Sequence, residues 1–283
     1  MIKDFKSRIG IDLGRKMAVE QAIEWAARHG VHHIQVETDT LPNALDSFDT
    51  ARCEAVRKLC EMHDVSLSLH TLSAVNVAEY SPFVSAAVDA YLTAYTDVAA
   101  RIGVATIVVH AGYHFTGDYE YRKTAALERL RRVADYAAKS CVTLLLENLN
   151  KEPADAEVHY LAYDLAEFRY FLDRLDSPGL GCSFTVNHAH LVPEGIDGFL
   201  DVMPIDRLGE VRLADNLGDR EVHLMPGTGN IDFGRLFERL ERAGYKGRYM
   251  CNFGSPENML EGRDLLARLA PAGPSFSEQQ QPP

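Results

Sequence analysis

Several short apolar runs in this chain end in, or are followed by, a side chain that can transfer a proton or bind a cation. Residues of this kind are Glu37, His70, His110 and Glu147, and further along the chain His188, His190, Arg212, Asp215, Glu221 and His223. Carboxylates and imidazoles act as general acids and bases, and arginine stabilises negative charge. Because such residues recur at the same end of successive runs, we expect a site for proton transfer or metal binding there.

His70, His110 and Glu147 end three consecutive apolar runs. If these runs are neighbouring parallel strands, about 4.8 Å apart, the three side chains can converge on one point. Two imidazoles and one carboxylate form a known catalytic zinc set, which also suits manganese or iron. The alternative is that both histidines hydrogen-bond Glu147 without a metal. The residues favour neither interpretation.

A second candidate set is formed by His188, Glu221 and His223. Glu221 and His223 are two residues apart, so they would share a face of an extended segment. A metal is one interpretation, but substrate contact or the linking of loops is favoured. The PGTG segment at 226–229 could present backbone amides to an anion. The alternative is a turn before a helix whose N-cap is Asn230 or Asp232.

Alternating strand-like and helix-like segments supply the scaffold for these residues. Strands are predicted at residues 8–13, 32–37, 65–70, 105–110, 142–147, 181–186, 210–213 and 247–253. Helices are predicted at residues 17–29, 52–63, 83–102, 119–139, 165–175, 195–202, 233–243 and 256–269. Eight such units of roughly 35 residues predict an α/β fold, a single-domain (β/α)8 TIM barrel over residues 1–270.

The active site of such a barrel lies at the carboxyl ends of its strands, where the polar residues fall. A doubly wound sheet is disfavoured because the first predicted strand continues as GIDLGRK, which is not a GxGxxG phosphate loop. Residues 271–283 (PAGPSFSEQQQPP) are polar and proline-rich, and we expect a disordered tail there.

Composition excludes several classes of protein. The net charge of −12 argues against a general nucleic-acid binder. The chain has no run of 18 apolar residues and no leader pattern, so we expect neither a membrane span nor secretion. Five cysteines without a CxxC predict reduced thiols in a cytoplasmic protein, with Cys141, Cys182 and Cys251 buried. The absence of GxSxG, GxxxxGK[ST] and HExxH disfavours serine hydrolases, P-loop proteins and zincins, and no nucleotide cofactor is expected.

Seven segments in order carry a family resemblance: SLHTLSAVNVAEYSP, IVVHAGYH, LLLENLN, CSFTVNHAH, VRLADN, EVHLMPGTGNIDF and GYKGRYMCNF. With them the chain resembles the xylose-isomerase-like TIM barrels over essentially its whole length up to residue 269. That family includes sugar (phosphate) isomerases and epimerases and the endonuclease-IV-type AP endonucleases.

The resemblance also identifies departures at the metal site. The isomerases of the family hold one divalent metal with a glutamate, an aspartate, a histidine and a second glutamate. The first matches Glu147, whereas the other three positions hold Thr185, Arg212 and Asn252. We therefore expect the usual metal site to be lost, with the Arg212 guanidinium supplying positive charge opposite Glu147.

The remaining cofactor expectation is either none or one divalent metal (zinc, manganese or iron) at a non-standard site. In the endonucleases one metal matches His70, His110 and Glu147, and this set is the candidate here. A second metal in those enzymes matches His188, His223 and Glu221, where glutamate stands for aspartate.

The resemblance implies an isomerase or epimerase that acts on a small sugar-like or hydroxy-carbonyl substrate through an enediolate. Glu147 would be the base, Arg212 would stabilise the oxyanion, and a histidine, namely His188, His110 or His70, would move the second proton. Substrate contacts are predicted for His70, His110, Glu37, Asn252, Thr185, Asp215 and His223.

The alternatives are a lyase or dehydratase acting on a related keto compound and a non-catalytic member that binds a ligand. Metal-dependent phosphodiester hydrolysis ranks last. The expected partner is a small molecule, with neither nucleic acid nor membrane, and a homodimer is the commonest arrangement for such a chain.

Overall fold

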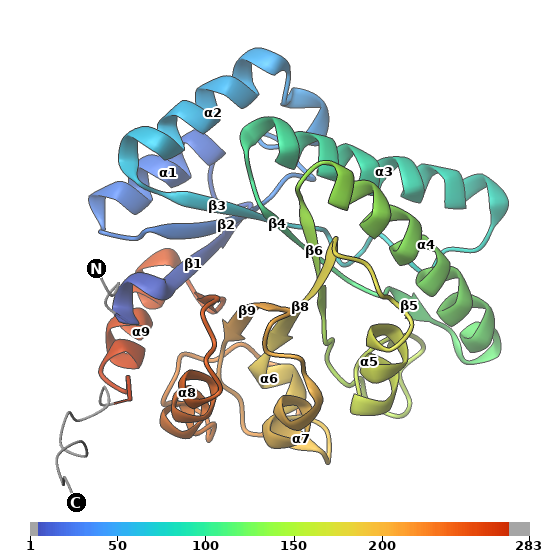
Figure 1. Ribbon diagram of the computed structural model, residues 1–283. Coiled ribbons are helices and arrows are strands. Elements are labelled where there is room, and N and C mark those ends of the chain that lie inside the picture. Colours follow the sequence, from blue (N-terminus) through green and yellow to red (C-terminus); the bar gives the residue numbers. More distant parts are fainter. Residues whose placement is uncertain (1–4, 272–283) are drawn as a thin grey trace, which may run out of the picture.

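The computed structural model describes residues 5–271, which form a closed parallel barrel surrounded by helices (Figure 1). Going around the barrel, the order is β1, β10, β9, β8, β6, β4, β3 and β2, and β2 pairs with β1 to close it. Their bounds are β1 (Ile9–Gly14), β2 (His33–Glu37), β3 (Ser66–His70), β4 (Thr106–Val109), β6 (Thr143–Glu147), β8 (Leu180–Thr185), β9 (Leu208–Leu213) and β10 (Arg248–Cys251). The predicted single-domain TIM barrel is confirmed.

The helices lie outside the barrel, and their ends follow ordinary capping chemistry. They are α1 (Val19–Arg28), α2 (Thr50–His63), α3 (Pro82–Ile102), α4 (Tyr119–Lys139), α5 (Leu165–Leu172), α6 (Val186–Ala189), α7 (Gly195–Val202), α8 (Phe233–Arg242) and α9 (Pro256–Ala267), with 3-10 helices η1 (Phe5–Arg8), η2 (Leu45–Ser47) and η3 (Thr116–Asp118). Asp232 caps α8 by accepting the backbone N–H of Arg235. Gly103 ends α3 with a φ of +89°.

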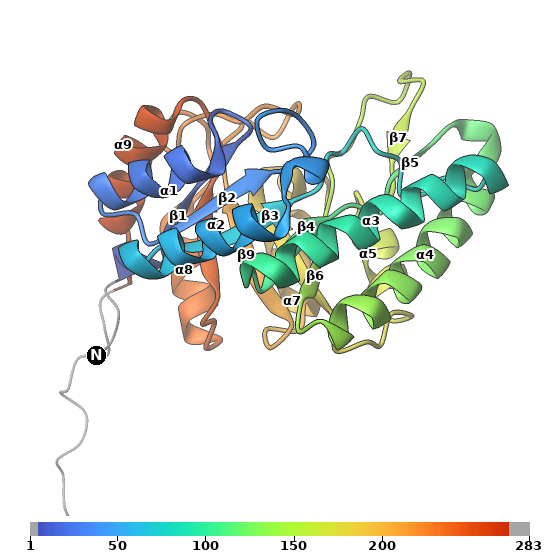
Figure 2. The ribbon, with the colours of Figure 1, turned by 90° about the horizontal axis from the view of Figure 1, so that it is seen from above.

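The structure differs from the sequence-based expectation in three places. Val186 belongs to α6, because the pairing of β8 with β9 ends at Thr185. An antiparallel ribbon of β5 (Tyr113–His114) and β7 (His159–Tyr160) was not predicted, since two-residue strands carry no periodic signal. Figure 2 shows this ribbon beside α4. Cys141 is exposed rather than buried because it lies in the turn between α4 and β6, where its φ is +57°.

The two faces of the barrel strands have different characters. Outward-facing residues are apolar and buried against the helices, as Ile34 and Val36 of β2 and Leu144 and Leu146 of β6 illustrate. Inside the barrel, polar side chains are fully or almost fully buried: Gln35, Ser68, Ser183, Glu210 and Arg212. The interiors of such barrels are usually filled by Val, Ile and Leu. Because these buried polar side chains cannot reach water, they need hydrogen-bond or ion-pair partners inside the barrel.

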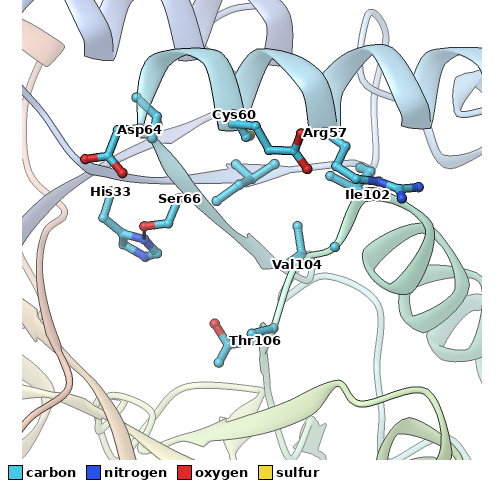
Figure 3. Close-up of a pocket in the computed structure, with 13 residues that line it drawn as sticks. His33, Arg57, Cys60, Asp64, Ser66, Ile102, Val104 and Thr106 are labelled. Atoms are coloured by element: carbon cyan, nitrogen blue, oxygen red, sulfur yellow. Dashed lines mark hydrogen bonds between the residues drawn. The ribbon is translucent and has the colours of Figure 1, made fainter.

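A cavity of about 390 Å³ lies at the amino-terminal ends of β2, β3 and β4 (Figure 3). His33 and Ser66 line it and hydrogen-bond each other through Nδ1 and Oγ at 2.8 Å. None of the predicted site residues lines this cavity, because those residues follow the opposite ends of the strands. The cavity is thus separate from the predicted site.

Two further expectations concern membranes and the tail. In the part of the chain that the structure describes, no helix has the length and apolar character needed to cross a bilayer. Of the predicted disordered tail, residues 272–283 lie outside the described residues. Cys182 and Cys251 are buried as predicted.

Candidate functional site

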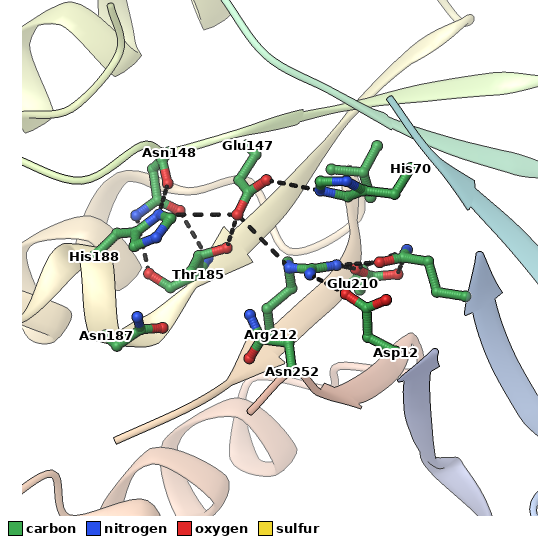
Figure 4. Close-up of polar contacts among 12 residues, drawn as sticks. Asp12, His70, Glu147, Asn148, Thr185, Asn187, His188, Glu210, Arg212 and Asn252 are labelled. Carbon is green, nitrogen blue, oxygen red and sulfur yellow. Dashed lines mark hydrogen bonds and ion pairs between the residues drawn. The ribbon is translucent and has the colours of Figure 1, made fainter. Parts of the chain in front are cut away.

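Glu147, at the end of β6, is the centre of the site at the carboxyl end of the barrel. Its Oε2 atom lies 3.2 Å from Nε2 of both His70 and His110. Its Oε1 atom accepts a hydrogen bond from the Thr185 hydroxyl and lies 3.6 Å from Nε of Arg212 (Figure 4). We call Glu147, His70 and His110 the Glu147 cluster.

The barrel topology explains why these residues meet. β3, β4 and β6 are adjacent parallel strands, with His70 paired in register to Val108, and Val109 to Leu146. His70 ends β3, His110 directly follows β4, and Glu147 ends β6. The predicted convergence of the three side chains is confirmed.

The Glu147 carboxylate is kept ionised although it is almost fully buried. Burial by itself would raise the pKa of Glu147, but the charge of Arg212 and the hydrogen bonds from His110 and His70 outweigh it. The pKa of Glu147 therefore lies well below its ordinary value. Burial, together with the charge of Arg212, lowers the pKa of His70. A neutral imidazole thus adjoins an ionised carboxylate, so Glu147 is in the form that can accept a proton.

The Arg212 guanidinium is already engaged by protein groups. Its Nη1 donates to Gln35 and, at 3.1 Å, to Glu210, and its Nη2 donates to Asp12 at 2.5 Å. Nε faces Glu147 and has no hydrogen-bond partner among the described residues. Arg212 thus mainly neutralises carboxylates of its own chain. Less of the guanidinium than predicted is left to stabilise an oxyanion of the substrate.

The charges around Arg212 form one buried network. The guanidinium lies among the carboxylates of Asp12, Glu147 and Glu210, and their charges raise the pKa of Arg212. Burial raises the pKa of Glu210 to about 7, although Arg212 and a hydrogen bond from Gln35 act in the opposite direction. Buried charges are tolerated only when they are paired. Arg212 is therefore the cation that makes this group of carboxylates compatible with burial.

A second cluster, which we call the Glu221 cluster, comprises His188, Glu221 and His223. Oε1 of Glu221 lies 3.3 Å from Nε2 of His188 and 2.7 Å from Nε2 of His223. The Nδ1 atoms of both rings contact backbone carbonyls, of Asn148 at 2.8 Å and of Asn252 at 2.7 Å. A carbonyl can only accept, so each Nδ1 carries a hydrogen, and Nε2 is the ring atom that faces Glu221.

His188 links the two clusters, because its Nδ1 atom also lies 3.8 Å from Oε1 of Glu147. Burial would lower the pKa of His188, but the hydrogen bond to Glu221 and the charges of Glu221 and Glu147 raise it. Burial would raise the pKa of Glu221, but hydrogen bonds from His188 and His223 lower it to about 2. His188 is thus suited to hold and deliver a proton beside Glu147.

Both clusters contain ligand atoms that lie within 4.8 Å of one another, so each can be tested as a metal site. Histidines that bind metals usually donate their other N–H to a carbonyl or carboxylate, as His188 and His223 do here. In the Glu147 cluster the Nδ1 atom of His110 is buried without a partner, and the Arg212 guanidinium opposes a cation. The residues of the Glu221 cluster therefore fit a divalent metal better.

The other predicted substrate contacts lie in different surroundings. Among residues 5–271, the amide oxygen of Asn252 is buried without a hydrogen-bond partner, and so is one carboxylate oxygen of Glu37. Thr185 is fully buried and holds Glu147 rather than presenting a free hydroxyl. Asn252 and Glu37 thus retain the capacity to bind a ligand.

The surroundings of Asp215 contradict its predicted contact with substrate and favour the turn interpretation of the PGTG segment. Its carboxylate is fully buried and accepts backbone N–H groups from Gly227, Gly229 and Ile231 at 2.9–3.1 Å. The backbone amides of the PGTG segment therefore bind the chain's own carboxylate rather than an external anion. Asp215 holds this loop in place and has no free oxygen for a substrate.

Asp12, Gln35 and Glu210 are site residues that the sequence analysis did not single out. They occupy inward positions of β1, β2 and β9 and contact Arg212. The sequence did contain a signal for these residues. Each is a polar residue that alternates with apolar neighbours along its strand, which is the pattern of side chains on opposite faces. Alternation identifies the inward face, whereas the choice of partners requires the closed barrel.

Comparison with known proteins places this geometry in context. The structure of a D-tagatose 3-epimerase-like protein superposes with a TM-score of 0.78 at 18% identity, covering 92% of this chain and 96% of the other. A D-psicose 3-epimerase from Clostridium cellulolyticum H10 gives a TM-score of 0.72 at 19% identity, covering 93% and 95%. A 3-keto-D-glucoside 4-epimerase from E. coli gives 0.73 at 18%, covering 93% and 98%.

Sequence comparisons agree with the fold. The chain is 22% identical over 191 residues to an uncharacterized protein, MJ1614, of Methanocaldococcus jannaschii, covering 65% of this chain and 70% of the relative. The model of the xylose isomerase-like TIM barrel family matches residues 23–269. With a match of this extent on a closed eight-stranded barrel, the chain belongs to the xylose isomerase-like TIM barrel family.

Proposed function

We propose that this protein is an isomerase or epimerase that moves a proton beside the carbonyl group of a small, polyhydroxylated substrate. The observation that carries the proposal is the ionised, buried Glu147 at the barrel mouth, with His188 at 3.8 Å. The resemblance of the fold to sugar epimerases supports the same class of substrate.

In this mechanism Glu147 removes a proton from the carbon next to the substrate carbonyl. The electron pair of the broken C–H bond forms the C=C bond of an enediolate, and negative charge develops on the carbonyl oxygen. His188 then supplies a proton to the neighbouring carbon or oxygen. Asn252 has a free acceptor oxygen that can bind a substrate hydroxyl.

Arg212 acts in this mechanism as a positioning residue for the base. It holds Glu147 ionised, and Asp12 and Glu210 hold Arg212. The Nε–H group of Arg212, which has no hydrogen-bond partner among the described residues, is the part of the guanidinium left for a substrate oxygen. Thr185 orients Glu147 through its hydroxyl.

For a resident metal, the Glu221 cluster is the arrangement we propose, with His188, Glu221 and His223 as ligands, and His188 would then bind the metal instead of supplying a proton. A divalent cation bound there would polarise a substrate oxygen as a Lewis acid. The Glu147 cluster, also proposed as a metal site from the sequence, is disfavoured by the nearby guanidinium.

Solvent exchange tests the proposed function directly. The protein is incubated in D₂O with D-fructose, D-tagatose, D-psicose and a panel of smaller hydroxy-ketones, and deuterium incorporation is followed by mass spectrometry and NMR. We expect incorporation at the carbon beside the carbonyl of at least one compound. The absence of exchange with every compound, in a folded protein, would contradict the proposal.

Product mass separates the two enzymatic alternatives. An isomerase or epimerase conserves the mass of the substrate apart from exchanged hydrogen, whereas a lyase of the dehydratase type loses water. The raised pKa of His188 is the observation that keeps the dehydratase alternative, because a protonated imidazole can protonate a leaving hydroxyl. Tight binding of a panel compound without any turnover would instead indicate a binding protein.

A further inference from the structure

Counted in strands around the barrel, Asn252 and Glu37 are equally far from Glu147. Going from β6 through β8 and β9, the third strand is β10, which Asn252 follows. Going the other way through β4 and β3, the third strand is β2, which ends at Glu37. An amide cannot exchange a proton in this reaction, but a carboxyl group can. The Glu37 carboxyl group can thus give or take a proton at the side of the barrel mouth away from Glu147.

The side chain of Glu37 faces into the barrel mouth. Gln35, two residues earlier on β2, contacts Glu210 and Arg212 inside the barrel, and side chains two apart on a strand share a face. Glu37 is also paired in register with His70, whose ring contacts Glu147. Register-paired residues of parallel strands point to the same side, so Glu37 lies on the same inner surface as the Glu147 cluster.

Space beside the Glu37 carboxyl is kept open by Gly14. The position that a Cβ atom would take on Gly14 is 3.5 Å from Oε1 of Glu37 and 3.8 Å from Oδ1 of Asp12. Gly14 has a φ of +51°, a conformation that glycine adopts without strain. A side chain at this position would enter the gap between the two carboxyl groups, so glycine leaves room beside Oε1 of Glu37.

The Glu37 carboxyl has little to hold it in the ionised form. Its Oε2 atom has no hydrogen-bond partner in the part of the chain that the structure describes, and the Nε atom of the largely exposed Arg15 is 3.9 Å away. Burial and the negative charges of Asp12 and Asp39 raise the pKa of Glu37, while Arg15 and Lys16 act in the opposite direction. Two carboxyl groups whose surroundings shift their pKa values in opposite directions are suited to opposite roles as acid and base.

We propose that Glu37 is a second catalytic residue, which reprotonates the substrate carbon from the side opposite Glu147 and so makes the protein an epimerase. This inference rests on the proposed function and goes beyond it, because Glu147 with His188 alone explains isomerisation. Two strands, β4 and β3, lie between the strands that carry Glu147 and Glu37, whereas His188 lies beside Glu147 on the same side of the mouth.

The step is balanced in atoms and electrons. Glu147 takes the proton from the carbon beside the carbonyl, and the C–H electron pair enters the enediolate. The carboxyl group of Glu37 then gives its proton to the opposite face of the same carbon, so that its O–H bond breaks and a new C–H bond forms while the carbonyl is restored. After product release Glu147 returns its proton to solvent and Glu37 takes one up. The result is inversion at one carbon.

The variant Glu37→Gln tests this assignment, with Glu54→Gln on the exposed face of α2 as the matched control. Each protein is incubated in D₂O with D-fructose, D-tagatose and D-psicose, and exchange and epimer formation are measured separately. For Glu37→Gln we expect deuterium exchange within about threefold of wild type and epimer formation at least about 100-fold slower. Glu147→Gln is expected to lose both activities.

The outcomes separate this inference from the proposed function. Unchanged epimer formation in Glu37→Gln, with exchange also intact, overturns the role of Glu37 and leaves the proposed function standing. Exchange without epimer formation in the wild type also overturns it. Absence of exchange in the wild type overturns the proposed function itself. If Glu37→Gln lowers Tm by more than about 10 °C, Glu37→Asp replaces it, and we expect epimer formation to fall more than exchange because the shorter acid reaches less far.

Discussion

The Glu147 cluster and the Glu221 cluster contain the same residue types, yet different groups hold them. In each, one carboxylate lies between two imidazole rings. In the Glu147 cluster the carboxylate is held by the Arg212 guanidinium and the Thr185 hydroxyl. In the Glu221 cluster the two imidazoles are held by backbone carbonyls.

This difference explains how similar residues can serve different chemistry. A guanidinium next to Glu147 favours its ionised form and opposes a second cation, so that carboxylate is available as a base. Carbonyls that accept from Nδ1 of His188 and His223 fix both rings with Nε2 facing Glu221, which leaves Nε2 as the atom that would bind a metal. The surroundings, rather than the residue types, decide between proton transfer and metal binding.

The largest effect we expect comes from replacing the two carboxylates one at a time. Glu147→Gln should lower the rate of deuterium exchange by about 10³-fold, because a general base contributes about 10²–10⁴-fold. Glu221→Gln should lower it by about tenfold or less. The exchange assay in D₂O measures both rates on the same substrate. Equal losses in the two variants would mean that the clusters do not have different roles.

Removing the guanidinium should be the next largest effect. Arg212→Met leaves the carboxylates of Asp12, Glu147 and Glu210 without their cation, and loss of one partner from a buried ion pair costs about 3–5 kcal/mol. Urea unfolding should show this loss in the free energy of unfolding. Arg212→Lys keeps the positive charge, so its loss in the free energy of unfolding should be less than half of the loss in Arg212→Met. Wild-type stability in Arg212→Met would show that the network is not needed for folding.

The pH dependence of stability should separate Glu210 from Glu221. The folded pKa of Glu210, about 7, lies above its unfolded value, so stability from this group falls as pH rises from about 4.5 to 7, by at most about 3 kcal/mol. The folded pKa of Glu221, about 2, lies below its unfolded value, so its contribution is present above pH 4.5 and lost as pH falls toward 2.

Urea unfolding at a series of pH values measures both effects. Glu210→Gln should flatten the curve between pH 4.5 and 7 and leave the acid limb unchanged. Glu221→Gln should reduce the acid limb only. A wild-type stability that rises between pH 5 and 7 and is unaffected by Glu210→Gln would contradict the assignment to Glu210.

The smallest effect we expect is on metal affinity. His223→Asn should weaken binding of added zinc by at least about tenfold, because loss of an outer-shell partner alone typically costs about 10–100-fold and His223 is a proposed ligand. The matched change in the other cluster, His110→Asn, should alter zinc affinity by less than about threefold. Isothermal titration with the metal-free protein measures both. Stronger dependence on His110 than on His223 would place the cation in the Glu147 cluster instead.

Much of the architecture follows from local sequence patterns. The alternation of apolar strands and helical segments predicted all eight barrel strands, and the strand ends placed His70, His110 and Glu147 together. This succeeds because side chains alternate with period two and neighbouring strands have a fixed spacing. Family resemblance added the replaced metal ligands at Thr185, Arg212 and Asn252, which no spacing rule identifies.

Tertiary structure alone decided what several of these residues contact. The sequence predicted Arg212 opposite Glu147, but its Nη atoms bind Asp12, Gln35 and Glu210 from three different strands. Likewise, only the folded loop shows that Asp215 accepts the backbone amides of Gly227 and Gly229, for which the sequence left an external anion as one interpretation. Hydrogen-bond partners depend on distances of a few tenths of an ångström between distant segments. Residue type and spacing determine which groups can meet, whereas packing of the closed barrel determines which do.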